Sequence, residues 1–241
     1  MKIIVCFKVI PDYDKVIDSD WKGYRFSYAK KNFGVFCEGA LESALRIKDS
    51  LSDTYLEAIT YGEEEEIFIH NLYAAGYDKV TVLSGRNEDF SPRSTARILS
   101  EYILKDKYDM VLLGEMVGPN DSGSLPYYLA NYLKCPVISN VTEFKYEDRL
   151  LAIAEDSEQI YSYEVKEKAV YIVSSAKYAY LRFSTYIERE KAKLMKADKK
   201  HVFSMGLAKK YKLRENIQEK KKTDKISIDD LKEMLRGEGN V

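Results

Sequence analysis

Along the first half of the chain, continuous apolar runs alternate with segments in which the apolar residues recur with a helical period. Four short runs are almost continuously apolar, which is typical of strands that are buried on both faces of a sheet. We expect these strands at residues 2–8, 54–60, 79–83 and 109–113. The segments between them have a helical period, as Leu41, Ala44 and Leu45 show in the helix expected from Glu38 onward. Strands and helices in this order form a parallel sheet with right-handed crossovers, so the pattern predicts an α/β fold.

Local signals mark the ends of two further helices. Residues 63–76 carry acidic side chains at the start and Gly76 where a left-handed C-terminal cap belongs. Residues 91–105 open with Ser91 and Pro92, a favourable pair for a cap and a first helical turn. Both helices fall between predicted strands, as a parallel sheet requires.

The second half of the chain has a different pattern. Residues 137–156 and 159–173 alternate apolar and polar side chains like antiparallel strands, with a turn at 146–149. Residues 169–187 are interpreted as a strand followed by a loop. The core is therefore expected to carry a small antiparallel extension.

The fourth predicted strand is followed by GEMVGPNDSGSLPYYLANYL, residues 114–133, which is rich in turn-forming residues. The next helix is expected to begin near 122–124, at the carboxyl edge of the parallel sheet, where such folds bind ligands. Unpaired N–H groups at a helix start favour a phosphate, and Gly118 and Gly123 would let it touch the main chain. The alternative is an ordinary capped loop. The chain contains neither a Walker motif nor GxGxxG.

Charge and composition narrow the function classes. The 241 residues carry a net charge of −1, so there is no global electrostatic case for binding nucleic acid or a membrane surface. Three widely spaced cysteines suit a reducing compartment, and no apolar run reaches membrane-spanning length. We therefore expect a cytoplasmic protein without membrane insertion. No nucleophile with a neighbouring base and no metal-ligand cluster is evident, so no independent catalytic site is predicted.

Composition also divides the chain near residue 187. Residues 1–187 hold the α/β pattern, whereas residues 188–241 are rich in lysine and poor in large apolar side chains. At 227–237 a short segment has an apolar stripe, a serine cap and a terminal glycine, which predicts a helix that docks on another surface. We expect a nucleotide-binding core followed by a C-terminal arm. Contact between the basic run and nucleic acid is the alternative, but acidic residues interrupt the run.

Four segments resemble, in this order and spacing, the β subunit of electron-transfer flavoproteins. CFKVIPD (6–12) resembles CVK-VPD, and FCEGALESALRIKD (36–49) resembles NPF-(D/C)-E-x-A-x-E-E-A-x-x-x-K. NLYAAGYDKVTVLS (71–84) resembles ALAMGADRAILL. GEMVGPNDSGSLPYYLA (114–130) aligns without a gap on GRQAIDGDTGQVGPQLA. The resemblance covers roughly residues 1–190.

The resemblance implies a parallel-sheet core of the adenine-nucleotide-hydrolase type, which is Rossmann-like. It implies a heterodimer with an α subunit that holds the electron-carrying FAD, while the β subunit holds either AMP or a second FAD. The chain would then be an electron-carrier subunit whose redox chemistry belongs to the flavin. The further partner would be an acyl-CoA dehydrogenase or another flavin dehydrogenase.

The resemblance also implies positions for the cofactor. Cys6 would lie beside the adenine, residues 34–37 would wrap the adenosine, and residues 119–127 would hold the phosphates. The complete implied set is Cys6, Phe7, Lys8, Gly34, Val35, Phe36, Cys37, Tyr61, Gly114, Pro119, Asn120, Asp121, Ser122, Gly123, Ser124, Leu125 and Tyr127. The family's Gly-Asp-Thr-Gly-Gln appears here as residues 120–124 without the glutamine, and its Asn-Pro appears as residues 34–35. The type of nucleotide therefore stays open.

The segment RFSTY (182–186) resembles R-Y-(P/A)-(S/T)-L, where the family's docking loop for partner dehydrogenases begins. The resemblance implies partner-binding roles for Arg182, Phe183 and Tyr186, with Tyr186 as the apolar anchor. The alternative is that Arg182 and Phe183 only pack the loop onto the body. For the whole chain, a stand-alone adenine-nucleotide sensor on the same fold is the second hypothesis, and a broad exposed apolar patch would favour the subunit.

Overall fold

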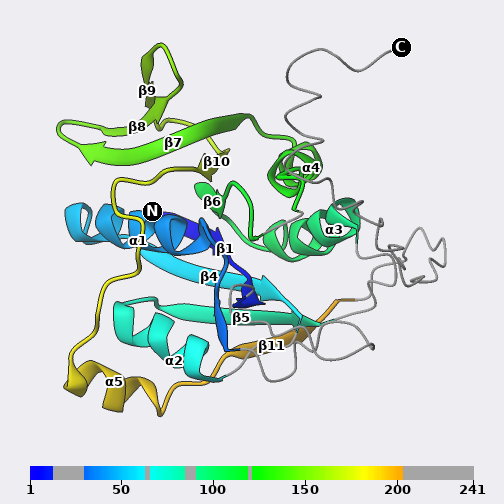
Figure 1. The fold of residues 1–241 in the computed structure, drawn as a ribbon, viewed down its shortest axis with the longest axis vertical. Coiled ribbons are helices and arrows are strands. Elements are labelled where there is room, and N and C mark those ends of the chain that lie inside the picture. The colour runs from blue at the N-terminus through cyan, green and yellow to red at the C-terminus, as the bar shows by residue number, and fades with distance from the viewer. Residues whose placement is uncertain (13–29, 63–65, 85–90, 119–120, 203–241) are drawn as a thin grey trace, which may run out of the picture. The chain divides into compact units, whose positions relative to one another are not determined.

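The computed structural model describes residues 1–12, 30–62, 66–84, 91–118 and 121–202. Its main element is a nine-stranded sheet with the strand order β11-β5-β4-β1-β6-β10-β7-β8-β9 (Figure 1). The strands of this sheet are β1 Lys2–Cys6, β4 Tyr55–Tyr61, β5 Lys79–Ser84, β6 Met110–Gly114, β7 Val137–Tyr146, β8 Leu150–Glu155, β9 Ile160–Glu164, β10 Ala169–Val173 and β11 Asp198–His201. A second, antiparallel sheet consists of β2 Val9–Pro11 and β3 Lys31–Phe33.

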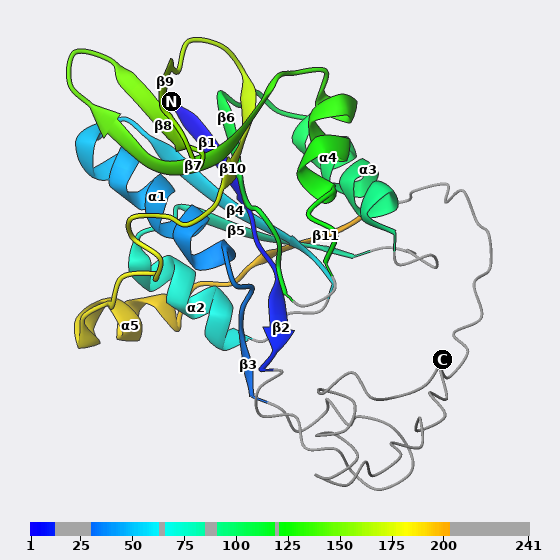
Figure 2. The ribbon, with the colours of Figure 1, turned by 45° about the horizontal axis from the view of Figure 1, so that its top comes forward.

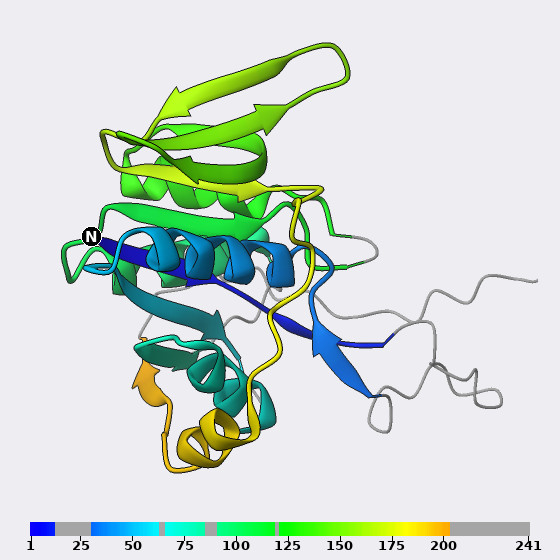
Figure 3. The ribbon, with the colours of Figure 1, turned by 90° about the vertical axis from the view of Figure 1, so that its left-hand side faces the viewer.

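Helices cover both faces of the large sheet. They are α1 Cys37–Ser50, α2 Glu66–Ala75, α3 Pro92–Ile103, α4 Leu125–Leu133 and α5 Tyr186–Ala192. The apolar faces of α1 and α2 join one hydrophobic cluster, and those of α3 and α4 join the other, on the opposite side of the sheet (Figures 1 and 3). α5 packs against α2. None of the helices in the described part of the chain is long and apolar enough to cross a bilayer.

The central strand β1 shows why the sheet is buried on both faces. Ile3 and Val5 point into the cluster with α1 and α2, whereas Ile4 and Cys6 point into the cluster with α3 and α4. β1 pairs in parallel with β4 and β6, and β4 pairs in parallel with β5. Apolar burial stabilises such a core by about 25 cal/mol per Å². The predicted parallel arrangement of the first four strands, and with it the α/β fold class, is confirmed.

The first strand is shorter than the apolar run predicts. β1 ends at Cys6, although the amide of Phe7 still donates to the carbonyl oxygen of Ile59 at 3.0 Å. The chain then leaves the large sheet, and residues 9–11 pair with β3, which Figure 2 shows beside β2 beyond the end of β1. One apolar run therefore supplies two strands of different sheets, which hydrophobicity alone cannot separate.

The antiparallel extension is confirmed with one difference. β7, β8 and β9 pair antiparallel. β10, the last part of the run 159–173 that was predicted to be antiparallel, instead pairs in parallel with β6 and with the first part of β7. β7 therefore belongs to both the parallel and the antiparallel parts of the sheet. Asn140 within β7 has a positive φ of 57°, next to the register shift opposite β10. An alternating pattern shows that a strand is half buried but not the direction of its neighbour.

Helix-end signals are confirmed in position. Gly76 follows α2 with φ 114°, in the region that favours glycine. Ser91 and Pro92 occupy the N-cap and first positions of α3, although the Ser91 side chain makes no capping hydrogen bond.

The first part of the predicted C-terminal arm lies on the body. α5 begins before residue 188, and β11 then pairs in parallel with β5 at the edge of the large sheet. Val202 follows β11 and is buried in the cluster with α3 and α4. The helix predicted at residues 227–237 lies outside the described residues.

Candidate functional site

A cavity of about 440 Å³ opens where β1, β4 and β6 end, at the carboxyl edge of the parallel sheet. Its lining comes from the loops after these strands and from the starts of α1, α3 and α4. The lining residues are Cys6, Phe7, Lys8, Cys37, Tyr61, Gly62, Pro92, Thr95, Leu99, Leu113, Gly114, Glu115, Val117, Asp121, Leu125 and Pro126. This volume falls within the usual range for small-molecule sites, and the position is the usual one for open α/β sheets.

Backbone contacts fix the side of the cavity formed by β1 and β4. Lys8 follows β1, and its Nζ donates to the carbonyl oxygen of Tyr61 at 3.0 Å. The carbonyl oxygen of Lys8 accepts from the amide of Gly34 at 2.8 Å. These bonds tie the segment before α1 to the ends of β1 and β4, so Cys6 and Cys37 are held in one wall.

The end of β6 lies against the start of α1. A Cβ on Gly114 would be 2.6 Å from the carbonyl carbon of Phe36, so only glycine permits this close approach. Farther along, the amide of Val35 donates to the carbonyl oxygen of Val117 at 3.0 Å. The segment 34–37 therefore supports the loop after β6.

Asp121 organises that loop from within. Its Oδ2 accepts from the amide of Val117 at 2.9 Å, and its Oδ1 accepts from the amide of Gly123 at 3.1 Å. Gly123 has φ 62°, which glycine adopts without strain. A Cβ on Gly123 would face the carbonyl oxygen of Glu115 at 3.2 Å, so this glycine serves the loop's own turn.

α4 begins directly after this loop. Ser124 is its N-cap, and the cap side chain makes no hydrogen bond to the helix backbone. The hydroxyl of Ser124 is instead 2.7 Å from that of Ser122. The first turn of α4 thus keeps the partial positive charge of a helix start, and Leu125 and Pro126 from this turn line the cavity.

The two cysteines in the wall are neutral at physiological pH. Burial raises the pKa of the Cys6 thiol far above its ordinary value, and the nearby Cys37 adds to the shift. Burial likewise raises the pKa of Cys37 to about 11, against the lowering effect of backbone hydrogen bonds from Lys8 and Gly34. Neutral, buried thiols act as small apolar contacts rather than nucleophiles.

The structure brings eight of the predicted cofactor-binding residues to the cavity. They are Cys6, Phe7, Lys8, Cys37, Tyr61, Gly114, Asp121 and Leu125. Seven others do not line it: Gly34, Val35, Phe36, Ser122, Gly123, Ser124 and Tyr127. The side chain of Val35 is 61% exposed and that of Tyr127 is 54% exposed, so both point to solvent. Pro119 and Asn120 lie outside the described residues.

Sequence reasoning missed part of the lining. Thr95 and Leu99 come from the first turns of α3, and Glu115 and Val117 come from the loop after β6. The predicted order of strands could have indicated α3, because its start follows β5 at the same edge of the sheet. Among the described residues, no group of three acidic, histidine or cysteine side chains is placed to hold a metal ion.

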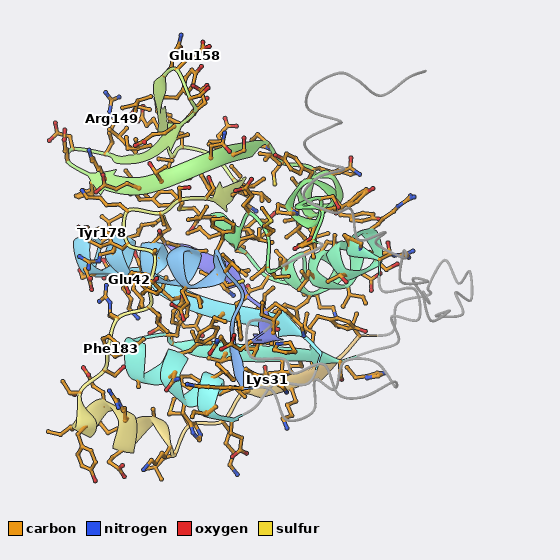
Figure 4. The ribbon with its side chains drawn as sticks, viewed as in Figure 1. Lys31, Glu42, Arg149, Glu158, Tyr178 and Phe183 are labelled. Atoms are coloured by element: carbon orange, nitrogen blue, oxygen red, sulfur yellow. The ribbon has the colours of Figure 1, made fainter. Side chains whose placement is uncertain are left out.

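The segment after β10 crosses α1 and is held there by a buried carboxylate. Glu42, which Figure 4 labels on α1, is 1% exposed. Its two oxygens accept from the guanidinium of Arg182 at 2.9 to 3.2 Å. The guanidinium also donates to Asp49, at 2.7 and 3.2 Å. These carboxylates raise the pKa of Arg182, so the anchor stays charged at any physiological pH. Arg182 therefore packs the segment onto the body.

The residues after this anchor are exposed. Phe183 is 95% exposed, and Tyr186, in the first turn of α5, is 76% exposed. Beside them lies a second cavity, of about 610 Å³, between β3, α2 and the segment 181–184. Of the two alternatives for this segment, the packing role fits Arg182 alone, because Phe183 does not pack on the body.

The fold and the position of the first cavity define an α/β protein with a cavity at the carboxyl edge of a parallel sheet, where open α/β sheets bind ligands. A model of the electron transfer flavoprotein domain matches residues 29–205. The chain therefore belongs to the electron transfer flavoprotein family.

Several relatives in this family are β subunits or subunits of larger complexes. The chain is 30% identical to the caffeyl-CoA reductase-Etf complex subunit CarD of Acetobacterium woodii, covering 69% of this chain and 64% of the relative. It is 28% identical to the electron transfer flavoprotein subunit beta of Homo sapiens, covering 56% of each chain. The corresponding subunit of Megasphaera elsdenii is 26% identical, covering 67% of this chain and 63% of the relative. The chain thus spans between about half and two thirds of the length of these relatives.

Proposed function

We propose that the chain is the β-like subunit of a heterodimeric electron-transfer flavoprotein and that its cavity holds an adenine nucleotide, either AMP or a second FAD. The observation that carries this proposal is the convergence of Cys6, Lys8, Tyr61, Gly114 and Asp121, which come from distant parts of the sequence, on one cavity. Family membership supports the same conclusion. Electrons would pass between dehydrogenase partners and an acceptor through the complex.

The residues of the cavity suit the two ends of a nucleotide differently. Cys6, Cys37 and Leu113 offer a buried apolar wall for a flat base. The start of α4 offers a positive helix end, which suits phosphate oxygens. A bound flavin would supply the redox chemistry, while the chain would fix its position and exclude water.

An interaction surface favours a subunit over a stand-alone sensor. Tyr180, Phe183, Tyr186, Ile187 and Leu194 are 65 to 95% exposed within fifteen residues of sequence. Monomeric proteins rarely expose large apolar side chains in such a group. We assign this surface to a protein partner, which would be a flavin dehydrogenase, with Arg182 as the anchor that holds the segment in place.

Co-expression with an α-like subunit of the same genome tests the proposal. We expect a complex that co-purifies at a one-to-one ratio, has the absorbance spectrum of bound flavin, and releases AMP or FAD on denaturation. The Gly114→Val variant is the matched test of the site, because its side chain would occupy the contact with Phe36. A chain that forms no complex but binds an adenine nucleotide alone would favour the sensor hypothesis. A chain that does neither would refute both.

A further inference from the structure

The charged groups that line the first cavity are unbalanced. Lys8 is the only cation among the described lining residues, whereas Glu115 and Asp121 are both carboxylates. The two thiols in the wall add no charge, because burial keeps Cys6 and Cys37 protonated. A phosphate monoester carries a charge of roughly −1.5 to −2 at neutral pH, so this lining would repel one.

The side-chain cation and the loop amides that could offset this repulsion already have partners. The ammonium of Lys8 donates to the carbonyl oxygen of Tyr61. The amides of Val117 and Gly123, which lie in the loop after β6, donate to the carboxylate of Asp121. A phosphate at this end of the cavity would have to displace the Asp121 carboxylate from both amides.

Glu115 differs from Asp121 in that its carboxylate is not used by the fold. Its backbone is fixed, because the amide donates to the carbonyl oxygen of Val173 at 2.9 Å and the residue follows the tightly packed Gly114. Its side chain is partly exposed and lines the cavity. Within the described part of the chain, no donor or cation is bonded to this carboxylate. A carboxylate held in this way accepts hydrogen bonds from ligand hydroxyl or N–H groups.

We propose that Glu115 is a specificity-determining residue, which selects a ligand end that carries hydroxyl or N–H donors and disfavours a phosphate at the end of β6. The ligand class is accordingly a nucleoside moiety, with any phosphate kept away from Glu115. This inference rests on the proposed nucleotide site and adds the charge preference of that site.

Calorimetric titration of the full chain, alone and with its α-like partner, tests the inference with adenosine and AMP as probes. The measured quantity is the ratio of the adenosine Kd to the AMP Kd. We expect a ratio near one for the wild type, because repulsion by the carboxylates offsets what a phosphate gains at the start of α4. The ratio should rise about tenfold in Glu115→Gln, which corresponds to about 1.4 kcal/mol, and further in Glu115→Arg. Glu147→Gln, in the exposed turn between β7 and β8, is the control and should leave the ratio unchanged.

The outcomes separate this inference from the proposed function. Equal ratios in the wild type and in both Glu115 variants would overturn the role of Glu115 while leaving the nucleotide site intact. The same conclusion follows if the wild type prefers AMP by a hundredfold. Failure of every variant to bind adenosine, AMP or FAD would overturn both. Thermal unfolding of each variant checks that the fold is retained, and Glu115→Gln keeps the volume of the native side chain.

Discussion

The contact between Arg182 and Glu42 should be the strongest single anchor of the proposed partner-binding segment. Arg182 bridges two carboxylates of α1, and its backbone amide also donates to Glu42 Oε2 at 3.1 Å. Replacing Arg182 with alanine leaves the Glu42 carboxylate, which is 1% exposed, with one side-chain partner in the described part of the chain, Arg46 at 2.8 Å.

Removal of one partner from a buried ion pair costs about 3–5 kcal/mol. The side chain of Arg182 is 29% exposed and Arg46 still neutralises part of the charge, so we expect about 3 kcal/mol for Arg182→Ala. Arg182→Lys keeps the charge but loses the two-pronged geometry, and should cost about 1–2 kcal/mol. Asp49→Asn is the matched control. The side chain of Asp49 is 55% exposed, so its loss should cost less than about 1 kcal/mol.

The assay is urea-induced unfolding followed by far-ultraviolet circular dichroism at constant m-value. A double-mutant cycle with Glu42→Gln should give a coupling energy of about 2 kcal/mol, because the two side chains share direct hydrogen bonds. Hydrogen exchange should also show faster opening of residues 178–187 in Arg182→Ala. If Arg182→Ala and Asp49→Asn are equally and slightly destabilising, the buried pair does not anchor this segment.

Four other changes test the cavity, a buried thiol, the exposed segment and the C-terminal residues. Gly114→Ala should destabilise the fold by about 2 kcal/mol and weaken nucleotide binding, measured by urea unfolding and calorimetry, since its Cβ would meet the backbone of Phe36 at 2.6 Å. The pKa of Cys37 in the folded state is about 11, above the unfolded value of about 8.5, so its stabilising contribution is complete below pH 8.5 and is lost as the pH rises toward 11. Between pH 8 and pH 10.5, the free energy of unfolding should therefore fall less in Cys37→Ala than in the wild type, measured by urea unfolding at each pH. Phe183→Ala should change the unfolding free energy by less than about 0.5 kcal/mol yet weaken dehydrogenase binding in surface plasmon resonance, as the ring is 95% exposed. Deleting residues 203–241 should preserve the circular dichroism spectrum of the core and weaken pairing with the α-like subunit in size-exclusion chromatography, and an undiminished complex would show that the arm is dispensable.

The predicted arm illustrates where composition and topology disagree. Residues 188–202 are rich in lysine, which suggested a segment separate from the core, yet they form most of α5 and the edge strand β11. Edge strands need few apolar residues, because one side faces solvent, and Val202, which directly follows β11, is buried. A deletion that begins at residue 188 should therefore destabilise the body, unlike one that begins at residue 203.

The core of the fold was predictable because burial on both faces forces an apolar run on each central strand. The site was predictable where a residue follows such a strand, as Cys6, Tyr61 and Gly114 do. It was less predictable in loops. Gly123 and Tyr127 are close in sequence to lining residues but do not line the cavity, and the Tyr127 side chain is exposed. The contact between Arg182 and Glu42 could not be predicted from the sequence. The two residues are 140 positions apart, and a glutamate within a helix pattern gives no sign that it is buried.

The ligand and partner content of the purified complex tests the central claim most directly. The full chain, co-expressed with an α-like subunit and purified without added cofactor, should elute as a heterodimer with a flavin absorbance spectrum. After denaturation, chromatography should detect an adenine nucleotide beyond the one flavin expected for the α-like subunit, either as AMP or as a second FAD. A chain that elutes alone, colourless and free of nucleotide, while the α-like subunit retains its flavin without it, would contradict the account.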